Sequence, residues 1–105
     1  MLHVHIGNPK IIEVGYDLNS SDVTCTSTDG PATTVIWRRN GKLLTIDEGT
    51  YRQSQMIVST ENAIYKTTLH FPVDSIEDYN AIYECMVLNS RGNDSSNIML
   101  QGKML

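Results

Sequence analysis

The run Tyr83-Glu84-Cys85-Met86-Val87-Leu88-Asn89-Ser90-Arg91-Gly92 decides the fold of this 105-residue chain. Tyr83, Cys85 and Val87 alternate with Met86 and Leu88, so a strand here would present the first three side chains to one side and the other two to the opposite side. The last four residues of the run are typical of a turn between paired strands. The run therefore predicts a hairpin of two strands, the first over about 81–89 and the second ending near residue 100.

The same two-residue alternation recurs along the rest of the chain, and no window shows the apolar spacing of an amphipathic helix. Asn40-Gly41 is the strongest short signal for a hairpin turn. Earlier strands are predicted over 11–14, 21–27, 34–39, 42–46, 51–58 and 64–71. The chain is therefore expected to be all-β, with eight or nine short strands and no internal repeat.

Length and charge narrow the class of protein further. The chain can enclose one modest core, so we expect a single domain over residues 1–105. A formal net charge of -4 and a pI near 5.1 argue against a nucleic-acid partner, which would require clustered Lys and Arg. Residues 1–5 lack the pattern of a secretory signal peptide, and we expect the domain to be excised from a longer multidomain protein.

The two cysteines, by their number alone, could be a redox pair, half of a zinc site or two unrelated buried residues. Their surroundings are more informative. Cys25 lies twelve residues before Trp37, Cys85 lies two residues after Tyr83, and sixty positions separate the cysteines. Together with the run from Tyr83 to Gly92, this spacing resembles the immunoglobulin superfamily, and within it the I-set domains of cell-surface adhesion molecules and receptors.

The resemblance implies a two-sheet Greek-key β-sandwich with one disulfide between the sheets, from Cys25 to Cys85. It also implies that Trp37 packs against this disulfide and that Tyr83 forms a tyrosine corner, with its hydroxyl bonded to nearby backbone. One departure concerns the Asp that the family places six residues before the second Cys, because that position is Tyr79 and the acid is Asp78. The alternative for the cysteines is a pair of free thiols, as in the intracellular I-set domains of muscle scaffold proteins.

Two short motifs support an extracellular location for the domain. Asn19-Ser20-Ser21 and Asn93-Asp94-Ser95 both match the acceptor pattern for N-glycosylation. Both fall in predicted turns, where a glycan on Asn19 or Asn93 would leave the core undisturbed. The expected protein is an extracellular glycoprotein domain whose parent is anchored to a membrane.

The sequence contains no motif for catalysis or for a metal or cofactor. His3 and His5 near the start are expected to be surface residues, because a metal site needs three or four converging ligands. The chain shows no pair of acids in an identifiable cleft, no Ser, His and Asp arrangement and no phosphate-binding Gly loop. We therefore expect no enzyme activity and no cofactor.

Alternation also predicts a binding face on the sheet that the family builds from its strands G, F, C and C′. Neighbours of inward residues such as Trp37 and Cys85 must point outward. The predicted outward set is Ile36, Arg38, Lys42, Leu44, Ile82, Glu84, Met86 and Leu88, with Arg38 and Glu84 at its rim. An exposed apolar patch of this kind is typical of a protein interface, although contact through an edge strand or through loops remains an alternative.

The predicted fold and binding face favour two functions. The first is a protein recognition module in cell adhesion or receptor signalling, which binds another immunoglobulin-type domain homophilically or heterophilically and could form a homodimer. The second is a structural spacer in an extracellular or sarcomeric multidomain protein, with no ligand of its own.

Overall fold

The computed structural model describes residues 7–17, 22–28, 34–46, 51–71 and 81–100. These ranges contain eight strands and no helix. The strands are β1 (Ile11–Asp17), β2 (Asp22–Thr28), β3 (Thr34–Arg39), β4 (Lys42–Leu43), β5 (Arg52–Ser59), β6 (Ile64–His70), β7 (Ile82–Asn89) and β8 (Gly92–Met99). The expectation of an all-β chain is confirmed.

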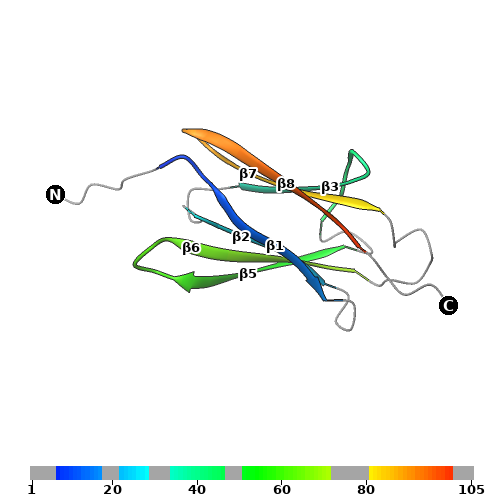
Figure 1. Cartoon of the computed structure of the whole chain (residues 1–105), viewed down its shortest axis with the longest axis horizontal. Helices are drawn as coiled ribbons and strands as arrows, with labels where there is room; N and C mark the ends of the chain where they lie inside the picture. The colour runs from blue at the N-terminus through cyan, green and yellow to red at the C-terminus, as the bar shows by residue number, and fades with distance from the viewer. Residues whose placement is uncertain (1–6, 18–21, 29–33, 47–50, 72–80, 101–105) are drawn as a thin grey trace.

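The strands form two four-stranded sheets that face each other (Figure 1). The first sheet has the order β1-β2-β6-β5 and the second has the order β4-β3-β7-β8, with antiparallel pairing throughout. Strands β4, β3, β7 and β8 stand where the immunoglobulin pattern places C′, C, F and G. The predicted sandwich is therefore the observed architecture.

The core between the sheets is built from inward residues of the central strands and from residues that directly adjoin strands. It consists of Val23, Cys25, Trp37, Leu69, Phe71, Ala81, Tyr83, Cys85, Val87 and Leu100. The Phe71 ring stacks on the Tyr83 ring with their centroids 5.0 Å apart, and Tyr51 adds a tilted ring 5.8 Å from Phe71. Tyr83 is completely buried, as predicted. The backbone before β7, where its hydroxyl was expected to bond and where Asp78 and Tyr79 lie, is outside the described residues.

The hairpin predicted at Asn40-Gly41 is present between β3 and β4. Asn40 has φ 50° and Gly41 has φ 82°, the positive values that a two-residue turn of this kind requires. Asn40 also exchanges two hydrogen bonds with Ile82, since its backbone N–H donates to the Ile82 carbonyl at 2.7 Å and its Oδ1 accepts from the Ile82 N–H at 2.8 Å. The turn is thereby tied to the start of β7.

The strand predicted over 42–46 ends at Leu43, and its outward residues were predicted wrongly. The tight turn pairs Arg38 with Leu43 and Arg39 with Lys42. Directly opposite residues share a face, so Leu43 lies on the outward side with Arg38, and Lys42 does not. Leu44 instead donates its N–H to the Trp37 carbonyl and packs against the core. The one-residue error in register exchanged the two faces.

Candidate interaction surface

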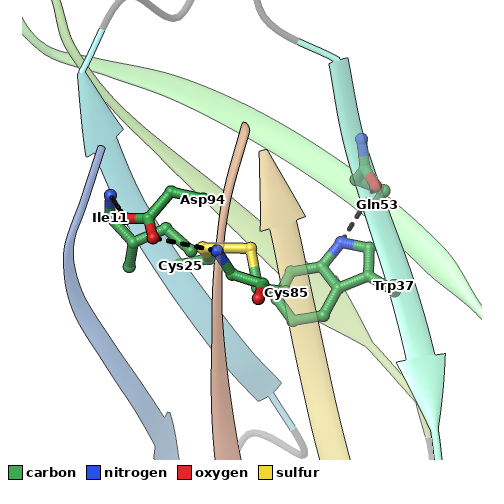
Figure 2. Close-up of a disulfide and its surroundings, with 7 residues drawn as sticks. Ile11, Cys25, Trp37, Gln53, Cys85 and Asp94 are labelled. Carbon is green, nitrogen blue, oxygen red and sulfur yellow. Dashed lines mark hydrogen bonds between the residues drawn. A yellow bond between two sulfur atoms is a disulfide. The ribbon is translucent and has the colours of Figure 1, made fainter. Parts of the chain in front are cut away.

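The disulfide and Trp37 hold the second sheet in register against the first. Cys25 of β2 and Cys85 of β7 are joined across the core, with their Cα atoms 6.5 Å apart (Figure 2). Trp37 is the direct cross-strand partner of Cys85, and its indole N–H donates to Gln53 Oε1 on β5 at 3.1 Å. This bond connects the two sheets a second time. The inward positions of β3 and β7 are therefore occupied, and their neighbours face outward.

The outward residues of β3 and β7 meet in direct cross-strand pairs. Ile36 lies opposite Met86, and Arg38 lies opposite Glu84. Arg38 Nη1 donates to Glu84 Oε1 at 2.8 Å, and these side chains are only 31% and 26% exposed. Glu84 also faces Asn97 on β8 and Arg38 faces Leu43 on β4, so the ion pair occupies the middle of the sheet. The prediction that Arg38 and Glu84 lie at the rim of the binding face is wrong, because both lie in its middle.

Three strongly exposed apolar side chains lie on two sides of the ion pair, at the end of the sheet and on the edge strand. Ile82 is paired with Met99 at the end of the sheet, and these side chains are 42% and 41% exposed. Leu43 on the edge strand is 63% exposed. We call the outward side of the second sheet the sheet face. Its apolar and charged residues are Ile36, Arg38, Leu43, Ile82, Glu84, Met86, Leu88 and Met99.

Leu43 and Met99 are members of the sheet face that the sequence analysis missed. Met99 could have been found by extending the alternation of the last strand, in which Ile98 and Leu100 turn towards the core. Leu43 follows from the turn, because a two-residue loop closes with equal numbers of residues on its two strands. The alternation around Met99 and the two-residue turn before Leu43 can both be recognised in the sequence.

A family model for the immunoglobulin domain matches residues 19–98. The chain belongs to the immunoglobulin domain family. A search of curated proteins found no match. Among solved structures, a titin fragment, A168169, superimposes with a TM-score of 0.64 at 22% identity, covering 90% of this chain and 48% of that chain.

Two other solved structures share this fold. A structure of Dpr2 Ig1-Ig2 in complex with DIP-Theta Ig1-Ig3 has a TM-score of 0.64 at 23% identity, covering 90% of this chain and 32% of that chain. The structure of Rst D1-D2 has a TM-score of 0.59 at 17% identity, covering 91% of this chain and 48% of that chain. This immunoglobulin domain thus spans about half, or less, of the chains that it matches.

One glycosylation motif lies on the sheet face and the other lies outside the described residues. Asn93 was predicted in a turn, but it is the second residue of β8, exposed and directly opposite Leu88. Its neighbour Asp94 accepts the Ile11 N–H at 2.8 Å and links β8 to β1 (Figure 2). A glycan on Asn93 would project beside Leu88 and leave the opposite end of the sheet face uncovered. Asn19 is outside the described ranges.

The structure brings together a Ser, His and Asp that the sequence analysis did not connect. On the first sheet, His70 Nδ1 lies 2.5 Å from Asp22 Oδ1, and His70 Nε2 lies 3.0 Å from Ser54 Oγ. The positions of Asp22, Ser54 and His70 along the chain do not predict these contacts, because the three residues meet only through the pairing of β2, β6 and β5.

These two contacts alone do not make a catalytic site. Acyl transfer also needs preorganised donors aimed at the developing oxyanion. The contact between Ser54 and His70 is exposed to solvent, and the three residues lie on three neighbouring strands of the first sheet. We interpret Asp22, His70 and Ser54 as a polar network that connects three strands on an open surface.

The described ranges contain no group of three or more His, Cys, Asp or Glu side chains placed to hold a metal ion. In the same ranges no helix is long and apolar enough to cross a membrane. His3 and His5 lie outside the residues that the structure describes.

Proposed function

We propose that this immunoglobulin domain is an extracellular recognition module of the I-set type, which binds another immunoglobulin-type domain through the sheet face. The I-set assignment is supported by the run from Tyr83 to Gly92 and by the short strand β4. The observation that carries the proposal is the sheet face itself, with exposed apolar side chains on two sides of a central ion pair.

The composition of the sheet face is that of an interface. Leu43, Ile82 and Met99 each leave more than two fifths of their surface in water, and Ile36 and Met86 lie between them and the far end of the sheet. A partner that covers these side chains removes apolar area from water, which drives association. The Arg38–Glu84 pair is already formed, so burying it would leave neither charge without a partner.

The type of partner is proposed from the comparisons. The Dpr2 structure holds Dpr2 Ig1-Ig2 in complex with DIP-Theta Ig1-Ig3, so both of its proteins contain immunoglobulin domains. A similar pairing, with a second copy or with a different domain, fits the sheet face. The disulfide and the exposed Asn93 support an oxidising, extracellular location. We propose in addition that the parent protein is anchored to a membrane.

The test is self-association of the unglycosylated domain by sedimentation velocity over a concentration series. We expect Met86→Glu or Leu88→Glu to weaken association by an order of magnitude or more, because a carboxylate would be buried in the contact. Arg38→Ala should act chiefly on the salt dependence of association. Thr26→Glu, on the outer side of β2 in the first sheet, is the matched control and should associate like wild type.

The alternative function is that of a structural spacer, and the matches to titin fragments fit it equally well at the level of the fold. A structural spacer does not need a partner that covers its sheet face. If the Met86→Glu variant and wild type sediment identically over the whole series, the spacer function replaces the recognition module.

A further inference from the structure

A second apolar surface lies far from the sheet face, on strand β5. Met56, Ile57 and Val58 are consecutive and are 57%, 56% and 52% exposed. Strand β5 is the last strand of the order β1-β2-β6-β5, so one of its sides pairs with β6 and the other has no strand partner within the part of the chain that the structure describes. In Figure 1 it lies at the margin of the first sheet, beside β6 and on the opposite side of the molecule from β7 and β8.

An open edge strand presents unpaired backbone N–H and C=O groups and is a template for another strand. Proteins usually protect such edges with charges, proline or bulges. Strand β5 has a bulge at Val58, where the register with β6 shifts between Ile57 and Ser59. The residues between Arg52 and Glu61 otherwise include no charge, proline or glycine. The pairing from Arg52 to Ile57 is regular, which leaves most of the edge available.

We propose that β5 pairs with β5 of a second copy of this chain, antiparallel about a two-fold axis, and joins the two first sheets into one. The charges near the two ends of β5 favour a second copy of this chain as the partner. Arg52 and Glu61 are exposed at opposite ends of the segment, and the ion pairs seen among the described residues, Arg38–Glu84 and His70–Asp22, include neither of them. In an antiparallel pair, Arg52 of each copy stands at the turn that carries Glu61 of the other.

The same register brings the apolar residues together. When the bulge at Val58 is counted as one extra residue on each strand, placing Arg52 opposite Glu61 of the second copy puts Met56 opposite Met56 of the second copy, on the two-fold axis. The bulges at Val58 then lie on either side of the axis and not on it. Two ion pairs thus flank a central apolar contact, and the free backbone groups of both edges become paired.

The experiment uses the Met86→Glu background, in which the sheet face does not contribute, so failure here is distinct from failure of the proposed function. Sedimentation velocity should show a monomer–dimer equilibrium, and Met56→Lys should raise its dissociation constant at least tenfold. Ile12→Lys is the control, because Ile12 is 55% exposed on β1 at the opposite edge of the same sheet. The Ile12→Lys variant should dimerise with the same dissociation constant as the Met86→Glu protein.

Charge reversal tests the register. Arg52→Glu and Glu61→Arg should each weaken the dimer about fivefold or more, since both place like charges opposite each other. An equimolar mixture of the two variants should recover the original affinity, because each heterodimer contains two opposite-charge pairs. Absence of a dimer in the background protein would overturn the proposal. So would equal effects of Met56→Lys and Ile12→Lys, or a mixture no tighter than its components.

Discussion

We expect Trp37→Ala to lower the free energy of unfolding by about 3–5 kcal/mol, the usual range for removing a large aromatic side chain from a core. Trp37 is 1% exposed and lies beside Cys85 between the sheets. The substitution would open a cavity next to the disulfide and leave Gln53 Oε1 without the indole N–H. Because small domains are stabilised by only about 5–15 kcal/mol in total, the variant should be largely unfolded at moderate temperature.

Urea denaturation followed by circular dichroism measures this effect. Trp37→Phe is the control, because it keeps an aromatic ring in the core and removes the donor to Gln53. It should cost less than Trp37→Ala and remain folded. In wild type, unfolding after reduction should raise the Trp37 fluorescence, since the neighbouring disulfide quenches the indole in the folded state. A folded Trp37→Ala variant with an unchanged Tm would contradict this account of the core.

Loss of the disulfide should be the second large effect, about 4 kcal/mol. Cys25 and Cys85 are separated by 60 positions, and a crosslink over so long a loop restricts the unfolded chain strongly. The measurement compares the free energy of unfolding of the oxidised protein with that of the Cys25→Ala/Cys85→Ala variant. The double replacement leaves no unpaired thiol behind, so it reports the crosslink together with the lost sulfur packing.

Thiol titration of denatured, unreduced protein provides an independent check. The disulfide predicts no reactive thiol per chain. Two reactive thiols would remove the main support for an extracellular location and would favour an intracellular spacer of the muscle-scaffold type.

The sequence predicted the fold well because the decisive residues are local and strongly patterned. Alternation defined β3 at its observed bounds and β7 within one residue, and the positive φ values at Asn40 and Gly41 agree with the turn expected there. The resemblance to immunoglobulin domains supplied the pairing of Cys25 with Cys85. The period of two along a strand needs no information about distant segments.

The errors arose where pairing between strands decides the outcome. Leu44 was predicted to face outward. The register of Arg38 with Leu43 instead turns Leu44 inward, because Leu43 and Leu44 are consecutive residues and point to opposite faces. The donation from Trp37 to Gln53 and the contacts of His70 with Asp22 and Ser54 join residues 16 to 48 positions apart. Their proximity depends on the order of strands in the sheets, which no local pattern contains.

Recognition through the sheet face is tested most directly by following amide chemical shifts over a concentration series. The Met56→Lys variant is the appropriate protein, because pairing through β5 should be absent from it. We predict that the shifts change at Ile36, Glu84 and Met86 and at their neighbours on the sheet face, while those of β2 and β6 stay constant. Shifts on the sheet face that stay constant up to the highest concentration would contradict the recognition module.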